Sequence, residues 1–126
     1  MDTIGENAAS KANQVEVVER YLSSVGNRDW DEFGRCITDD VVRIGPYGDT
    51  YRGRTDYVAF LADLMPRLAG YAMRVDRIVS EGDVVAVELR ETVEIDGAPK
   101  VTPECLVFDI DPDGRIAKIA IYIRSS

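Results

Sequence analysis

The sequence predicts an α+β fold, in which three amino-terminal helices pack on a strongly curved antiparallel (mixed) sheet to form a cone. Two observations predict it: helical periodicity is confined to the first 70 residues or so, and strand-like alternation broken by hairpin turns fills the rest. The chain has 126 residues, 45% of them hydrophobic, which is enough for one buried core. We therefore expect a single domain over 13–126, preceded by a flexible lead-in at 1–12.

The helices are predicted from apolar residues that recur every three or four positions. The first is expected from about Asn13 to Val25, and Gly26-Asn27 ends it. Asp29 is placed to cap a second, short helix. A third helix begins near residue 54, with Thr55 as its N-cap. The apolar stripe of this third helix consists of Val58, Leu61, Leu64, Met65 and Leu68.

The strands follow from period-two alternation and from turn residues. Two short strands are expected at 41–45 and 50–52, separated by a loop that contains Pro46 and Gly48. Longer strands are expected at about 71–80, 83–95, 101–110 and 115–124. Because the helices come first, we expect them to cover one face of the sheet and to leave the cone with an open mouth.

Two glutamates, Glu91 and Glu104, fall on strand faces that are otherwise apolar. A two-residue turn at Asp96-Gly97 would pair Glu91 with Thr102, and a four-residue turn would pair it with Glu104; both registers put the glutamates on one face. Adjacent carboxylates in an apolar setting must hold a proton, meet a cation or face water. The pattern is typical of an acid/base pair or a ligand anchor. Alternatively, both side chains reach solvent at the rim of the sheet.

Composition excludes several classes of function. The chain has no histidine, so histidine triads and histidine metal ligands are absent. A net charge of -8 without a basic patch argues against binding to nucleic acid or to an anionic membrane. Cys36 and Cys105 are isolated, which fits a reducing cytoplasm, and no signal peptide or membrane span is visible. We expect a cytoplasmic protein that uses no metal and no cofactor.

Several short segments carry a family signal. They are residues 21–22, 27–33, 38–42, 45–48 and 51–54, together with the closing Asp-Pro-Asp-Gly-Arg-Ile at 111–116. They resemble the SnoaL-like and ketosteroid-isomerase-like members of the nuclear transport factor 2-like superfamily, over about residues 13–124. The resemblance implies the cone fold. It does not imply one function, because the superfamily contains isomerases, polyketide cyclases, dehydratases, epoxide hydrolases and non-catalytic binding domains.

Compared residue by residue, the resemblance to ketosteroid isomerases implies an incomplete catalytic set. Tyr21 falls on the position of the tyrosine that donates a hydrogen bond to the oxyanion. The position of the proton-shuttling aspartate is occupied by Gly45, and that of the second acid by Leu106. The usual isomerase machinery is therefore missing two of its members.

The resemblance to limonene-type epoxide hydrolases is also partial. Glu91 falls near the first aspartate of that machinery. The arginine two residues before it is replaced by Leu89, and the aspartate of the last strand by Ile121. The carboxylate of SnoaL-type cyclases has no secure match in the chain.

A polar set nevertheless remains for the inside of the cone, namely Tyr21, Arg43, Glu91 and Glu104. Arg43 lies on a strand face that the family turns toward the pocket, and its guanidinium would keep neighbouring glutamates ionised. Tyr47 belongs to the loop that rims such cones. The residues expected to bind the substrate are Arg43, Leu89, Leu106, Tyr47 and Ile121.

Two functions follow as hypotheses. In the first, the protein is an enzyme for an apolar small molecule, with Glu91 and Glu104 as acid and base and Tyr21 as a donor, and it catalyses isomerisation, cyclisation, dehydration or water addition. In the second, the same cone is a non-catalytic module that binds a ligand or another protein. The outer sheet face also predicts a homodimer, because it carries apolar residues that no helix remains to cover.

Overall fold

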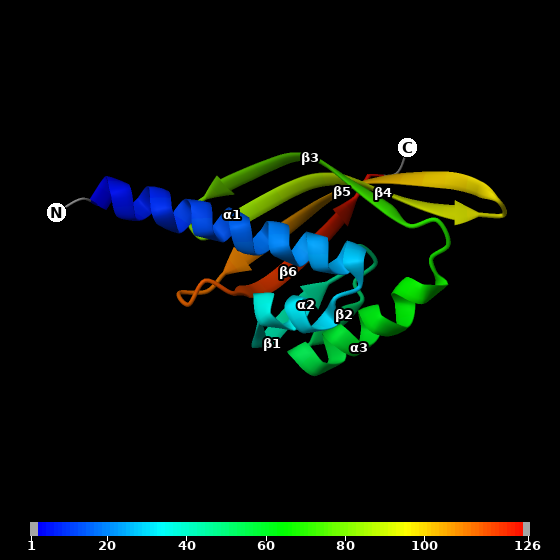
Figure 1. Ribbon diagram of the computed structural model, residues 1–126, viewed down its shortest axis with the longest axis horizontal. Coiled ribbons are helices and arrows are strands. Elements are labelled where there is room, and N and C mark those ends of the chain that lie inside the picture. The colour runs from blue at the N-terminus through cyan, green and yellow to red at the C-terminus, as the bar shows by residue number, and fades with distance from the viewer. Residues whose placement is uncertain (1–2, 125–126) are drawn as a thin grey trace.

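The computed structural model describes residues 3–124 (Figure 1). Its elements, in chain order, are α1 (Thr3–Asn27), α2 (Trp30–Cys36), β1 (Ile37–Ile44), β2 (Thr50–Arg52), α3 (Arg54–Leu64), the 3-10 turn η1 (Met65–Arg67), β3 (Ala72–Glu81), β4 (Val84–Ile95), β5 (Ala98–Ile110) and β6 (Ile116–Ile123). Three helices and six strands confirm the predicted α+β class.

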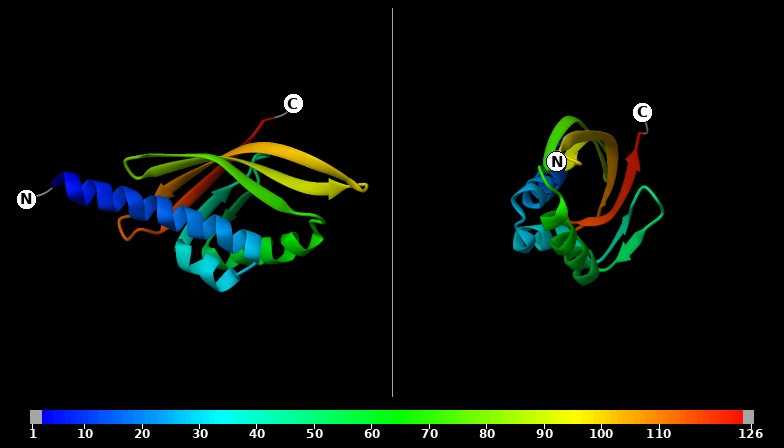
Figure 2. Two further views of the ribbon diagram at one scale, coloured as in Figure 1. Left: turned by 45° about the horizontal axis from the view of Figure 1, so that its top comes forward. Right: turned by 90° about the vertical axis from the view of Figure 1, so that its right-hand side faces the viewer.

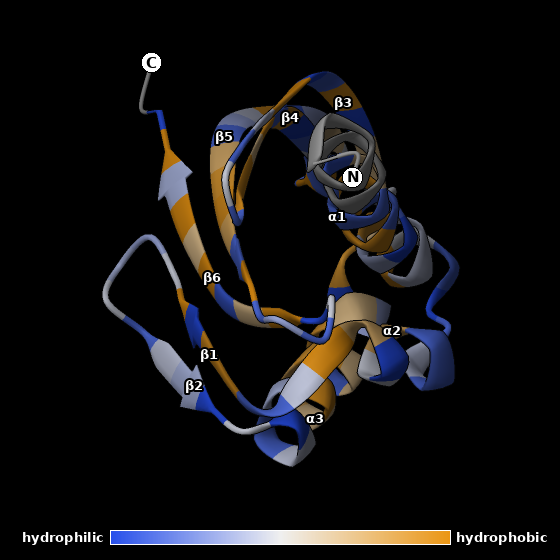
Figure 3. Ribbon diagram, turned by 90° about the vertical axis from the view of Figure 1, so that its left-hand side faces the viewer, coloured by the Kyte–Doolittle hydropathy of each residue, from blue (hydrophilic) through white to orange (hydrophobic). Residues whose placement is uncertain are grey.

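The strands form one mixed sheet in the order β2-β1-β6-β5-β4-β3. Neighbouring strands are antiparallel except β1 and β6, which are parallel. The sheet curls around the helices from β3 at one edge to β2 at the other, and α1 lies beside β3 (Figure 3). The two edges do not meet, so the sheet is strongly curved but not closed.

Helix α1 is longer than predicted, because it begins at Thr3 and not near Asn13. Residues 3–12 show no apolar stripe, but they contain three alanines, which favour helix by propensity alone. Residues 1 and 2 of the predicted lead-in lie outside the described residues. The apolar stripe does mark the part of α1 that enters the core, where Val18, Tyr21 and Leu22 are buried.

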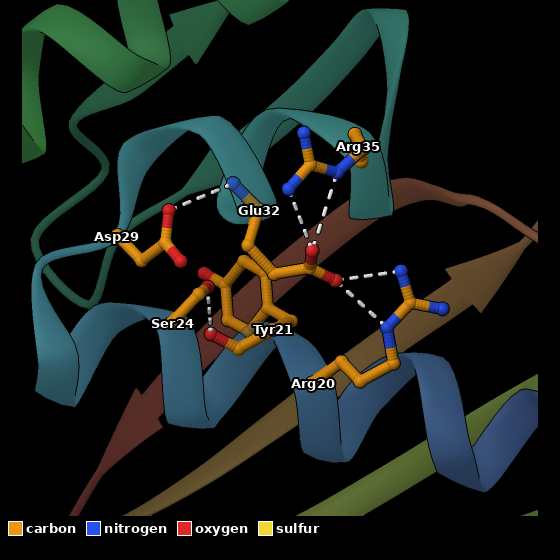
Figure 4. Close-up of polar contacts among 6 residues, drawn as sticks. All are labelled: Arg20, Tyr21, Ser24, Asp29, Glu32 and Arg35. Atoms are coloured by element: carbon orange, nitrogen blue, oxygen red, sulfur yellow. Dashed lines mark hydrogen bonds and ion pairs between the residues drawn. The ribbon is translucent and has the colours of Figure 1, made fainter.

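The junction of α1 and α2 is fixed by exposed polar contacts. Asp29 caps α2, as predicted, by accepting a hydrogen bond from the Glu32 amide at 3.1 Å. The Glu32 carboxylate accepts hydrogen bonds from Arg20 of α1 and from Arg35 (Figure 4). The hydrogen bond from Arg20, followed by that from Arg35, lowers the pKa of Glu32. These contacts orient α2 but contribute little to stability, because all three side chains are partly exposed.

Helix α3 differs from the prediction at its start and on its buried face. Gly53 is the N-cap, with φ 91°, and Thr55 does not cap the helix. A backbone with this φ favours glycine over any residue with a side chain. The buried face consists of Tyr57, Leu61 and Met65, spaced by four, whereas three other members of the predicted stripe are only partly buried.

The turn at Asp96-Gly97 settles the register that the sequence left open. Both residues have positive φ, 54° and 79°, as a tight hairpin turn of the I′ type requires. Glu91 therefore pairs with Thr102, and Glu104 pairs with Leu89. The predicted strand at 41–45 is also longer, since β1 begins at Ile37 and changes register before Val42.

Candidate functional site

Glu91 and Glu104 lie on the concave face of the sheet, as diagonal neighbours on β4 and β5. The register places Glu91 opposite Met73 of β3 and opposite Thr102, and it places Glu104 opposite Leu89. Both glutamates are half-buried. The pairing of β4 with β5 runs without a bulge, so the period-two pattern predicted their shared face correctly.

Tyr71 supplies a contact that the sequence analysis missed. It lies just before β3, and its hydroxyl donates a hydrogen bond of 2.5 Å to Oε2 of Glu91. Burial, and then the nearby Glu91 charge, raises the pKa of Tyr71, so the hydroxyl keeps its proton and acts as a donor. The sequence placed Tyr71 at the start of an expected strand at 71–80, but it did not indicate that the Tyr71 hydroxyl would contact Glu91.

Glu104 resolves the repulsion between the two carboxylates by holding a proton. Burial, followed by its hydrogen bond with Glu91 and the Glu91 charge, raises the pKa of Glu104 to about 9, and Arg43 opposes this shift. At neutral pH Glu104 is therefore a carboxylic acid. Glu91 accepts a hydrogen bond from the Tyr71 hydroxyl. An acid and a base thus stand side by side on one wall.

Arg43 is buried, as predicted, but its ion pair is with Asp49 at 2.6 Å and not with either glutamate. Its guanidinium carbon lies 5.0 Å from the ring centroid of Phe60 and 5.8 Å from that of Tyr51. The two rings stack at 4.1 Å. The expected neutralisation of the glutamates by Arg43 is therefore replaced by a proton on Glu104.

The Asp49 carboxylate fills the space in front of Gly45. A Cβ added at Gly45 would overlap both carboxylate oxygens of Asp49 and would lie 2.6 Å from Nη1 of Arg43. A side chain at position 45 would therefore require the Asp49 and Arg43 side chains to move, and Asp49 of the following turn supplies a carboxylate there. Burial acts to raise the pKa of Asp49, but hydrogen bonds from Arg43 and the turn backbone outweigh it and lower the pKa. Asp49 is consequently a weak base.

Tyr21 points into the core, as its helical position predicted, and its hydroxyl is hydrogen-bonded to that of Tyr57 on α3. Burial raises the pKa of Tyr21 well above its ordinary value and that of Tyr57 to about 12, so both remain neutral hydroxyls. Tyr57 was missed, although its spacing of four from Leu61 and eight from Met65 could have placed it on the inner face of α3.

The other predicted lining residues are distributed unevenly. Leu89 and Leu106 are buried in the wall beside the glutamates, and Ile121 is half-buried against the core. Tyr47 is 84% exposed in the β1–β2 turn, so the structure does not bring it to the others.

Cavities adjoin the predicted polar set without being centred on it. One of about 510 Å³ lies between α1 and β3 and is lined in part by Tyr71 and Met73. Another, of about 320 Å³, includes Glu104 and Leu89 among mainly outer-face residues, and a third, of about 590 Å³, lies between α2 and α3. Tyr21, Arg43 and Glu91 line none of these three cavities.

Two further observations concern ligands and membranes. Within the part of the chain that the structure describes, no three histidine, cysteine, aspartate or glutamate side chains are grouped so that they could hold a metal ion. Among the described helices, none combines the length and apolar character that crossing a membrane requires.

Comparisons with known proteins agree on the fold. The family model of the SnoaL-like domain matches residues 18–119. An LEH-like epoxide hydrolase from M. tuberculosis is 25% identical, with a TM-score of 0.79 over 90% of this chain and 84% of that one. A candidate ketosteroid isomerase from Kribbella flavida is 19% identical, with a TM-score of 0.81 over 92% and 81% of the two chains. A candidate SnoaL-like polyketide cyclase from Jannaschia is 22% identical, with a TM-score of 0.80 over 90% and 86%. No curated protein matches the chain.

Proposed function

The chain belongs to the SnoaL-like domain family, and from this premise we propose that it is an enzyme that uses Glu91 as a general base and Glu104 as a general acid on a small, mainly apolar molecule. One observation carries the proposal: two carboxyl groups share the concave face, and one is protonated at neutral pH while the other accepts a hydroxyl. A carboxyl group whose pKa is raised beside a second carboxyl group suits acid/base catalysis.

Hydration of an epoxide is the reaction that this pair fits best. Glu91 removes a proton from water as the water oxygen attacks an epoxide carbon. The carbon–oxygen bond breaks, the epoxide oxygen takes the proton of Glu104, and a diol is formed. Transfer of the proton from Glu91 to Glu104 across their mutual contact then restores the starting state. The resemblance to an epoxide hydrolase supports this choice among the reactions expected from the family.

Leu89, Leu106 and Ile121 are proposed as apolar wall around the reacting atoms. Tyr21, paired with Tyr57, is proposed as a neutral hydrogen-bond donor. Both hydroxyls are deeply buried.

Turnover of a panel of small apolar epoxides tests the proposal. Glu91→Gln and Glu104→Gln should each lower kcat/KM by about 10²–10⁴, the usual contribution of general acid/base catalysis. Glu88→Gln is the matched control, because Glu88 lies on the same strand but is exposed on the opposite face and pairs with Arg77. Full activity in Glu91→Gln would remove Glu91 from the mechanism.

A non-catalytic binding module is the second candidate. It is favoured by the ion pair between Arg43 and Asp49, and by Gly45 and Leu106, which lie at positions where ketosteroid isomerases carry catalytic acids. Melting experiments separate the two without a substrate. Removing one member of a repelling carboxyl pair should leave stability unchanged or raised. Marked destabilisation in both glutamine variants would instead indicate a structural network, and would favour the binding module.

We also propose that the protein resides in the cytoplasm, because its two cysteines are free thiols, as is usual in a reducing compartment.

A homodimer through the outer sheet face is a further proposal. On that face Val101 and Tyr122 are 52% and 60% exposed, and none of the described helices covers it (Figure 2). Light scattering at tens of micromolar should give twice the monomer mass, and Tyr122→Glu should give the monomer. A monomeric mass for the unchanged protein would contradict this assembly.

A further inference from the structure

A groove of about 510 Å³ runs between the carboxyl-terminal half of α1 and the edge strand β3. The two elements lie side by side in both views of Figure 2. This volume is within the range of small-molecule sites. The residues that line it are Glu19, Leu22, Ser23, Gly26 and Asn27 from α1, and Tyr71, Ala72, Met73, Val75 and Ile78 from β3 and the residue before it.

The inner wall of the groove touches the proposed base. The hydroxyl of Tyr71 donates to Glu91, and Met73 is the cross-strand partner of Glu91. Both residues line the groove, and both are direct neighbours of Glu91. A molecule in the groove would therefore lie one side chain away from Glu91, and a polar group on its inner end could reach the Tyr71 hydroxyl.

The lining indicates what kind of molecule fits. Leu22, Met73 and Ile78 make the walls apolar, and Val75 is 42% exposed there. Glu19 is an acidic lining residue, the groove is lined by no lysine or arginine among the described residues, and the whole chain has a net charge of -8. An anion would meet the charge of Glu19 with no lining cation to offset it, whereas an uncharged apolar molecule would meet complementary walls.

We propose that this groove binds the apolar part of an uncharged small molecule, and that Tyr71 at its inner end positions the polar group of that molecule against Glu91. The inference rests on the proposed function, because it assigns the substrate's apolar part to a place beside the acid/base pair. Tyr71 is then a positioning residue. Its hydroxyl turns from Glu91 to an oxygen of the bound molecule, which frees the carboxylate to accept a proton.

Two fluorescent dyes that differ by one sulfonate test the binding site. Neutral N-phenyl-1-naphthylamine should bind saturably, and at least about tenfold more tightly than anionic 1-anilinonaphthalene-8-sulfonate. Ser23→Phe, which fills the groove from α1, should weaken binding of the neutral dye by about tenfold or more. Ala59→Phe is the control, because Ala59 is exposed and lines the separate cavity between α2 and α3. It should leave the affinity within about twofold.

A second blocking variant keeps the test valid if Ser23→Phe fails to fold. Gly26→Leu reaches the same groove, and a Cβ added at Gly26 meets no atom within 4 Å. The proposal is overturned if the neutral dye does not bind saturably, if the sulfonate binds as tightly, if both blocking variants keep full affinity, or if Ala59→Phe weakens binding as much as they do.

Tyr71→Phe tests the positioning role, since it keeps the apolar wall and removes only the hydroxyl. Dye affinity should change by less than about threefold. In the unchanged protein the carboxylate ¹³C resonance of Glu91 should shift when uncharged 1-acetylnaphthalene is added, because its ketone oxygen can accept the Tyr71 hydroxyl. This shift should be lost in Tyr71→Phe, and an equal shift in both would overturn the role. If the dye experiments fail, the groove proposal is wrong but the proposed acid/base roles of Glu91 and Glu104 are unaffected. If Glu91→Gln keeps full activity, the acid/base proposal is wrong but binding in the groove is unaffected.

Discussion

Asp49 and Glu104 are two carboxyl groups of the same cone whose pKa values are shifted in opposite directions. Asp49 meets a buried cation, Arg43, and its pKa is lowered. Glu104 meets a second carboxylate, Glu91, and its pKa is raised to about 9. A carboxylate held by an arginine stays charged and exchanges no proton near neutral pH. A carboxyl group that shares a site with another carboxylate holds a proton that it can give away. Asp49 therefore fits a structural role, whereas Glu104 fits the proposed acid/base chemistry.

Removing the cation should have the largest effect on stability. Arg43→Met leaves Asp49 without its partner and removes the guanidinium from the Phe60 and Tyr51 rings. Breaking a fully buried pair costs about 3–5 kcal/mol, and because the Asp49 side chain is 41% exposed we expect about 2 kcal/mol, measured by urea unfolding. The double variant Arg43→Met/Asp49→Asn should recover part of this loss. Additive losses would show that the pair is not coupled.

Replacing Glu104 by glutamine should have the opposite effect and raise stability above neutral pH. The folded pKa of Glu104 lies above its unfolded value, so the folded state keeps a proton that the unfolded state releases. This contribution to stability is complete below about pH 4.5 and is lost as pH rises toward about 9. Glu104→Gln cannot lose a proton, so its Tm should decline less over this range and exceed that of the unchanged protein by roughly 3–6 °C at about pH 8.

The control for this pH effect is Glu88→Gln, which removes an exposed carboxylate from the same strand. Its Tm should follow the pH dependence of the unchanged protein. If Glu104→Gln shows the same slope as Glu88→Gln, the carboxyl pair does not hold a shared proton, and the contrast with Asp49 fails.

The tyrosine pair should contribute less. Tyr21→Phe deprives the buried Tyr57 hydroxyl of its partner and should cost about 1 kcal/mol in the free energy of unfolding. Tyr57→Phe should cost a similar amount. The double variant should lose less than the sum, because no single hydroxyl is then left buried without the other. A strictly additive result would contradict a coupled hydroxyl pair.

The smallest effect is expected from Asp49 on the acid side. Its folded pKa lies below the ordinary value of 3.8, so its contribution is present above that pH and is lost as pH falls through the folded pKa. Thermal unfolding between about pH 2 and about pH 5 should therefore be less steeply pH-dependent in Asp49→Asn. An unchanged slope would mean that Arg43 does not favour the charged form of Asp49 in the folded state.

Local patterns predicted most of the fold. Strands β4, β5 and β6 lie within a few residues of the expected ranges, because alternation and turn residues act over short stretches of chain. The errors occur where two local signals compete. The start of α1 depends on helix propensity in a segment without an apolar stripe. In α3, either Tyr57 or Val58 could face inward, and packing places Tyr57 there.

In the candidate site as well, local patterns predicted some residues and missed others. The inward positions of Tyr21, Glu91 and Glu104 were predictable, since each follows from a period of 3.6 or 2 within its own element. The inward position of Arg43 was expected from the family resemblance. The hydrogen-bond partners of three inward residues, namely Tyr71, Asp49 and Tyr57, were not predicted. Two of the three lie outside regular elements, where no periodicity indicates the direction of a side chain.

Local periodicity and turn residues thus predicted the order of the elements, the inward faces of Tyr21, Glu91 and Glu104, and the adjacency of two carboxyl groups across one hairpin. Only the tertiary structure decided which partner each charge meets: Asp49 for Arg43, and Tyr71 and Glu104 for Glu91. The reason is physical. The direction of a side chain follows from backbone period, whereas the energy of a charge depends on burial and on distances of a few ångströms to groups that loops bring from elsewhere in the chain.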